Sequence, residues 1–297
     1  MSFSSHVKEE LCRTALSRKC CIQAEAYGVL LFCNSFKREG IRIVTESGPF
    51  SQRLPVLFQK AFGVEFDALP PDKPGKRTLA VSDPDKVAAI GETFGHDPGE
   101  SVALHINFGV LEEDHCRTAF FRGAFLAGGS VTDPDKGYHL ELVTSHYNVG
   151  REMPVLLREA GFSPKQTQRK SNYVTYFKHS EHIEDFLTAV GAPVAAMEIM
   201  NAKVEKHLRG SVNRRVNCDA ANLDKTVDAA QEQIAAIQRL EQRGLLPELP
   251  EKLQEAATLR LENPELTLSQ LAALCSPPVS KSALNHRLRK LAELAGE

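Results

Sequence analysis

Two stretches of the chain are apolar on all sides and rich in small residues, a pattern typical of buried helices. The first covers 24–36, and the second covers 118–129 and includes most of the segment FRGAFLAGGSV (121–131). Glycine inside a helix costs about 1 kcal/mol relative to alanine. Small residues also let two helix axes approach closely, so we predict that these two helices lie against each other.

The order of elements after each apolar helix is nearly the same. The first pass has β-type runs at 40–46, 64–69 and 77–82, an amphipathic stretch at 54–63 and a helix at 85–94. The second has a strand at 138–145, an amphipathic stretch at 149–162, a hairpin that turns near 171–172 and a helix at 181–191. A repeat this long indicates two similar halves, about 20–95 and 115–192, in one α+β domain with pseudo-twofold symmetry.

The pattern changes after Pro193 and becomes almost entirely helical. We predict that the α+β domain covers 1–207 and is followed by a linker at 208–222, because 213–223 is polar and turn-like. An all-α domain, 223–297, then begins with an amphipathic stripe over 223–243 that ends at Gly244. A further helix is expected over 251–262.

The last part of the all-α domain has the pattern of a helix-turn-helix motif. Thr267 and Gln270 form a capping box that predicts a helix over 268–275. Ser276, Pro277 and Pro278 then interrupt the chain, and Ser280 can cap a second helix over 281–294. Two short helices joined by a tight turn, the second of them basic, are typical of DNA-binding proteins.

The second helix of this pair has two distinct faces. Leu284, Leu288 and Leu291 should face the core. The opposite side carries Ser282, Asn285, His286 and Arg289. Arginine can pair with guanine and asparagine with adenine in the major groove. Ser280, Lys281, Arg287 and Lys290 flank this face and suit phosphates. The alternative is an ordinary amphipathic helix with a solvated polar face.

Further basic residues lie in the predicted hairpin and beyond the α+β halves. They are Arg169, Lys170, Lys178, Arg209, Arg214 and Arg215. We expect secondary contacts with DNA phosphates at these residues. Charged residues on a strand edge can equally serve to prevent aggregation.

Composition limits the class of protein. The chain is 42% hydrophobic and 25% charged, with a net charge of -2. It shows no signal peptide and no apolar run of membrane-spanning length, so we expect a cytoplasmic, nucleoid-associated protein with no membrane partner. Among the seven cysteines there is no C-x-x-C pair, which argues against a zinc site. We therefore predict no metal and no cofactor, with reduced thiols, although the adjacent Cys20 and Cys21 could be redox-active.

The repeated halves resemble the LAGLIDADG homing endonucleases. In that family the two small-residue helices form the dyad, and an acid in the eighth position of each motif binds the catalytic metals. With Gly28 and Gly123 as third residues of the motifs, Cys33 and Gly128 occupy those positions. Neither offers a carboxylate, so the resemblance implies a domain without catalysis.

The whole chain resembles the WhiA family of bacterial sporulation and cell-division regulators. The segments that carry this resemblance are SFSSHVKEEL (2–11), the two degenerate motifs, VNRRVNCDAANL (212–223) and SKSALNHRLRKL (280–291). It implies a degenerate homing-endonuclease domain, a C-terminal helix-turn-helix domain, binding to double-stranded DNA and a role in transcription, cell division or chromosome segregation.

Two alternatives to a DNA-binding regulator without catalysis remain open. One is a divergent metal-dependent nuclease that uses Glu25, Asp133 or Asp135. The other is a scaffold whose N-terminal domain binds a protein partner while the C-terminal domain binds DNA.

Overall fold

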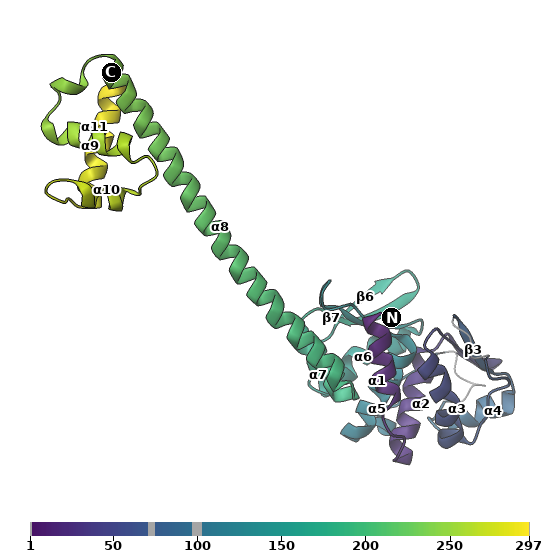
Figure 1. Cartoon of the computed structure of the whole chain (residues 1–297). Helices are drawn as coiled ribbons and strands as arrows, with labels where there is room; N and C mark the ends of the chain where they lie inside the picture. Colours follow the sequence, from purple (N-terminus) through teal and green to yellow (C-terminus); the bar gives the residue numbers. More distant parts are fainter. Residues whose placement is uncertain (1, 71–74, 97–102, 297) are drawn as a thin grey trace. The chain divides into compact units, whose positions relative to one another are not determined.

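The computed structural model describes residues 2–70, 75–96 and 103–296 (Figure 1). The chain divides into two compact units, residues 1–206 and 207–297. In the part of the chain that the structure describes, no helix combines the length and the apolar character needed to cross a membrane.

The first unit contains two halves of similar element order. The first half follows α1 (Phe3–Cys12) and comprises α2 (Lys19–Phe32), β1 (Ser35–Lys37), β2 (Gly40–Thr45), α3 (Gly48–Phe62), β3 (Arg77–Val81) and α4 (Pro84–Glu92). The second follows η1 (Phe108–Leu111) and comprises α5 (Asp114–Gly128), β4 (Gly129–Val131), β5 (Leu140–Thr144), α6 (Tyr147–Glu159), β6 (Lys165–Arg169), β7 (Asn172–Phe177) and α7 (Ser180–Val190). Each half has one antiparallel sheet, with strand orders β1-β2-β3 and β4-β5-β7-β6.

Helices α2 and α5 pack along each other and form the centre of the first unit, as the small residues predicted. A Cβ atom on Gly28 would lie 2.1 Å from the backbone oxygen of Phe120. One on Gly123 would lie 2.0 Å from the backbone oxygen of Glu25. The two backbones therefore touch, and glycine is needed at both positions because any side chain would meet a carbonyl group.

The expected strand at 64–69 is absent. Val64 and Phe66 are buried there, but Asp67 makes a single backbone hydrogen bond, from its N–H to the Ala80 oxygen at 2.9 Å. Pro70, which follows, has no N–H with which to extend a ladder. The two-residue hairpin turn is at Lys170 and Ser171, one position earlier than predicted, and Lys170 has a left-handed φ of 55°. Helix α1 and the short strands β1 and β4 were not anticipated.

Helix α8 (Pro193–Gln242) contradicts the prediction of a turn-like segment at 213–223. No glycine or proline occurs between positions 211 and 243, so nothing in the backbone chemistry interrupts the helix. The asparagines suggested turns because their side chains compete for backbone hydrogen bonds, but asparagine costs a helix less than glycine or proline does. The boundary between the two units lies within α8, and the predicted 208–222 linker is helical.

The second unit is built from the last part of α8, η2 (Leu246–Glu248), α9 (Glu251–Glu262), α10 (Leu268–Leu274) and α11 (Lys281–Gly296). Gly244, with a φ of 70°, follows the end of α8, and Leu245 N–H donates to the Leu240 oxygen at 3.0 Å. This confirms the predicted glycine C-cap. The core joins apolar side chains from α8, α9, α10 and α11, among them Ile237, Ala257, Leu271 and Leu288.

Candidate functional site

Helices α10 and α11 form the predicted two-helix motif (Figure 1). The Thr267 hydroxyl accepts from Gln270 N–H, and the Gln270 side chain accepts from Thr267 N–H, so the capping box is present. Ala283 N–H donates to the Ser280 hydroxyl at 3.2 Å, which caps the start of α11 as predicted. Between the helices, Val279 N–H donates to the Ala272 oxygen at 3.0 Å and closes the turn.

The two faces of α11 are separated as the helical wheel predicted. Leu284, Leu288 and Leu291 are each 1% exposed. Asn285 is half-buried on the outer side, while the other predicted contact residues except Arg287 are exposed, namely Ser280, Lys281, Ser282, His286, Arg289 and Lys290. Lys290 lies 3.4 Å from Glu293 in an exposed ion pair. Exposed ion pairs contribute little to folding stability. Within the described residues, Lys281 and Arg289 make no ion pair.

The structure does not place Arg287 on the outer face of α11, where it was predicted to contact phosphates. Its Nη1 lies 3.0 Å from Glu255 Oε2 on α9, and its side chain is only 16% exposed. The other oxygen of the same carboxylate, Oε1, accepts from Ser276 N–H at 2.6 Å. Glu255 thus connects α9 both to the turn between α10 and α11 and to α11 itself. Arg287 is one partner in this internal contact.

A second internal arginine positions α10. Arg260 on α9 is 2% exposed, and its Nη1 donates to the Leu266 oxygen at 2.9 Å. This contact holds the segment that precedes the Thr267 cap. Neither Glu255 nor Arg260 was singled out from the sequence, because nothing local marks a charged helix residue as buried.

The ends of α2 and α5, where the homing endonucleases carry their acids, have no carboxylate at the aligned positions. Cys33 is buried, its thiol donates to the Leu30 oxygen at 3.2 Å, and burial raises its pKa to about 12. A Cβ atom on Gly128 would lie 2.4 Å from the Val143 oxygen. The position of Gly128 therefore has no room for an acidic side chain.

A lysine lies at this end of α5 instead. Lys8 Nζ, from α1, donates to the Leu126 oxygen at 3.0 Å and lies 5.9 Å from the centre of the Phe125 ring. Burial lowers the pKa of Lys8 to about 8. The positive charge near the C-terminus of α5 interacts favourably with the helix dipole.

This lysine predicts a specific dependence of stability on pH. Because its pKa is lower in the folded chain than the usual 10.5, the unfolded chain binds the extra proton between about pH 8 and 10.5. The free energy of unfolding should therefore rise with pH across this window, by on the order of 1–3 kcal/mol, relative to the same curve for Lys8→Met. Urea denaturation of both proteins at several pH values measures the difference. If the free energies of unfolding of wild type and Lys8→Met change with pH in the same way, Lys8 does not have a lowered pKa in the folded chain.

The three acids of the nuclease alternative are not brought together. Glu25 is 1% exposed, and both of its oxygens are bound by arginines: Arg53 Nε at 2.6 Å from Oε1, Arg53 Nη2 at 3.0 Å from Oε2 and Arg122 Nη1 at 3.1 Å from Oε2. A carboxylate held by two guanidinium groups is not available to a divalent cation. This contradicts Glu25 as a metal ligand.

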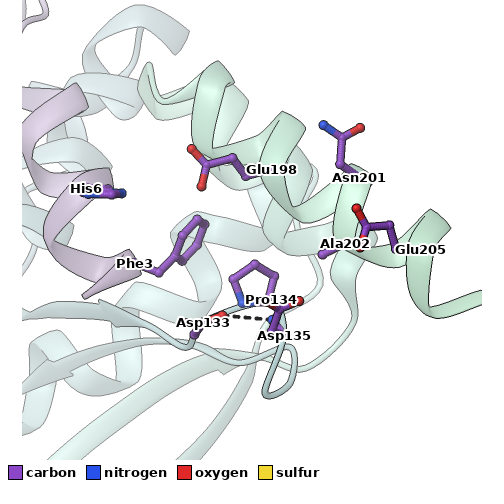
Figure 2. Close-up of a pocket in the computed structure, with 9 residues that line it drawn as sticks. All are labelled: Phe3, His6, Asp133, Pro134, Asp135, Glu198, Asn201, Ala202 and Glu205. Atoms are coloured by element: carbon purple, nitrogen blue, oxygen red, sulfur yellow. Dashed lines mark hydrogen bonds between the residues drawn. The ribbon is translucent and has the colours of Figure 1, made fainter. Parts of the chain in front are cut away.

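Asp133 and Asp135 lie in the turn after β4, in another part of the unit. Figure 2 shows them beside α1 and α8, where with Phe3, His6 and Glu198 they line a pocket of about 380 Å³. Asp133 Oδ1 accepts from Asp135 N–H at 3.0 Å and organises the turn. They do not share a site with the ends of α2 and α5.

The secondary basic residues are all exposed, and the contacts of Arg169 and Lys178 are defined. Arg169 Nη1 lies 2.9 Å from Glu141 Oε2, and Lys178 Nζ lies 5.6 Å from the centre of the Tyr176 ring. Lys170 is at the hairpin turn, and Arg209, Arg214 and Arg215 are on α8. Their contact with DNA stays a prediction.

Comparison with known proteins agrees with this organisation. Residues 117–209 match the model of the WhiA LAGLIDADG-like domain, and residues 212–295 match the WhiA C-terminal HTH domain. The crystal structure of full-length DUF199/WhiA from Thermatoga maritima has the same fold, with a TM-score of 0.59 and 24% identity over 100% of this chain and 98% of that one. The molecule thus combines a LAGLIDADG-like domain with a helix-turn-helix domain.

Two similar proteins cover the chain almost completely. A protein of Ruminiclostridium cellulolyticum named "probable cell division protein WhiA" is 38% identical, over 99% of this chain and 97% of that protein. One of Clostridium novyi with the same name is 37% identical, over 100% and 98%. The chain belongs to the WhiA family.

Proposed function

We propose that this protein is a non-catalytic regulator that binds double-stranded DNA through α11. The observation that carries the proposal is the outer face of α11, where Arg289 is exposed and has no ion-pair partner among the described residues while the leucines opposite it are buried. Arg289 and Asn285 suit base edges in the major groove. Ser280, Lys281 and Lys290 suit the phosphates on either side.

The absence of catalysis is part of the same proposal. Two-metal cleavage of a phosphodiester needs hard oxygen ligands around the divalent ions. The aligned positions hold a buried thiol, Cys33, and a glycine, Gly128, whose surroundings exclude a side chain. We expect no nicking of supercoiled plasmid in the presence of Mg²⁺ or Mn²⁺.

The proposed biological role is supported by the names of the relatives. Proteins of nearly the same length and 37–38% identity are named probable cell division proteins, so we propose a regulatory role in cell division, exercised at the nucleoid. A protein partner for the N-terminal unit remains a prediction from the sequence.

Base contacts by α11 are tested with Arg289→Ala and Asn285→Ala. Each should weaken binding to the preferred genomic fragment by about 1–3 kcal/mol and relax the preference at one base pair, because a bidentate base contact is lost. Fluorescence anisotropy with the preferred fragment and with a set of single-base variants measures both effects.

Two further variants separate base-specific recognition from sequence-independent electrostatic binding to DNA. Lys290→Ala should weaken binding to all sequences alike and reduce the salt dependence by about one ion. Arg243→Ala removes an exposed arginine that lies outside α11 and should change neither property. Unaltered affinity and sequence preference in Arg289→Ala and Asn285→Ala would remove α11 as the reading element.

A further inference from the structure

Four side chains with metal-binding atoms meet at the beginning of the two central helices. Cys20 and Cys21 lie in the first turn of α2, and His115 and Cys116 lie in the first turn of α5. Their ligand atoms, three sulfurs and one ring nitrogen, all lie within 4.8 Å of one another. The two pairs are brought together by the pseudo-twofold packing of α2 against α5.

The distances suit a tetrahedral ion. His115 Nδ1 lies 3.4 Å from Cys21 Sγ and 3.2 Å from Cys116 Sγ. In a tetrahedral zinc site, bond lengths near 2.3 Å for sulfur and 2.0–2.1 Å for nitrogen place neighbouring sulfur and nitrogen ligands about 3.6 Å apart. Only small side-chain adjustments would be needed to place an ion among the four atoms.

The four residues lie at the N-terminal ends of two helices. Both cysteine-bearing turns are helix N-termini, whose backbone N–H groups stabilise negative charge. Zinc binds cysteine as thiolate, so binding of the ion would release thiol protons.

We propose that Cys20, Cys21, His115 and Cys116 bind one structural Zn²⁺ that joins the two halves of the first unit. Three thiolates and one imidazole form a complete four-ligand set, the type found in structural zinc sites rather than catalytic ones. The ion would connect residues 94 positions apart and hold the N-terminal ends of α2 and α5 together. The glycine contacts do the same further along the helices.

The spacing argument that excluded a zinc site does not apply to this arrangement. C-x-x-C spacing is needed when one short turn supplies both cysteines. Here each helix supplies two adjacent ligand residues from its first turn. The packing of the two helices brings the two pairs together, so no single short loop has to supply two cysteines.

The full chain, purified without chelator, should contain one equivalent of zinc by plasma mass spectrometry. Cys20→Ser and Cys116→Ser should each lose most of it, whereas Cys218→Ser, which changes an exposed cysteine on α8, should retain it. His115→Cys should also retain zinc, because thiolate is an equally suitable ligand. Co²⁺ added to the metal-free chain should give the absorption of a tetrahedral thiolate site in wild type and in Cys218→Ser. Cys20→Ser and Cys116→Ser should not give it.

Each remaining outcome overturns the proposal. These outcomes are a chain with free thiols and no metal, a disulfide among these cysteines by mass spectrometry, and iron with labile sulfide. Zinc that persists at full occupancy in Cys20→Ser and Cys116→Ser would place the ion elsewhere. Because Cys20 is exposed, its serine variant should keep the wild-type far-UV circular dichroism, so loss of metal there would not reflect unfolding.

Discussion

Gly123→Ala should disrupt the packing of α2 against α5 and destabilise the first unit by more than about 3 kcal/mol. Overpacking a well-packed core costs typically about 1–3 kcal/mol when side chains can adjust. Here the added methyl group would lie 2.0 Å from the Glu25 backbone oxygen, and a helix backbone cannot move without shifting the whole element. Because the chain has no tryptophan, urea denaturation followed by far-UV circular dichroism is the appropriate measurement.

Gly210→Ala, in the second unit, is the control for replacing a helical glycine that has no close backbone neighbour. Gly210 lies within α8, and a Cβ atom there would have ordinary contact with Arg214 Nη1, at 3.5 Å. Alanine should stabilise the helix at this position by up to about 1 kcal/mol. If Gly123→Ala and wild type unfold at the same urea concentration, the close contact between α2 and α5 is not present in solution.

Glu25→Gln should cost about 3–5 kcal/mol, because it leaves two buried guanidinium groups without their shared carboxylate. Arg53 is only 6% exposed and Arg122 only 11% exposed in their side chains. The amide keeps the shape of the carboxylate but offers one acceptor where there were two charged oxygens. Arg53 Nη1 would still donate to the Cys12 and Thr14 oxygens, so the side chain should remain in place with its charge unpaired.

Glu9→Gln is the control, because it removes a carboxylate from an exposed ion pair instead of a buried one. Glu9 pairs with Arg13 at 2.7 Å, but the side chains are 35% and 75% exposed. Exposed pairs of this kind contribute less than about 1 kcal/mol. Since the two units can unfold separately, the comparison should use the transition that Glu25→Gln shifts. Equal effects of the two variants would mean that the Glu25 cluster is solvated in solution.

The interpretation of Glu25 shows why composition and motif position could not decide its role. An acid beside a LAGLIDADG-like motif is a reasonable candidate for a metal ligand. Arg53 and Arg122, which neutralise it, are 28 and 97 positions away in the sequence. The ion pairs exist only because α3 and α5 both pack against α2.

Local patterns predicted most elements well, and their failures have physical causes. Continuous apolar sequence with small residues identified the central helices, and the period of apolar residues identified both faces of α11, because both patterns involve only neighbouring residues. Segment 64–69 has the composition of a strand but makes only one ladder hydrogen bond. Segment 213–223 has turn-like polar residues but no glycine or proline, so it is helical.

The sequence by itself determined the capping box at Thr267, the polar outer face of α11, the tight glycine contacts of α2 and α5, and the missing carboxylates at Cys33 and Gly128. Only the tertiary structure decided that Arg287 is held by Glu255 while Arg289 is free of ion pairs among the described residues, and that two adjacent pairs, Cys20–Cys21 and His115–Cys116, form one cluster. The reason is that helix periodicity and capping depend on residues a few positions apart, whereas the partner of a charged or thiol side chain depends on which distant elements pack together.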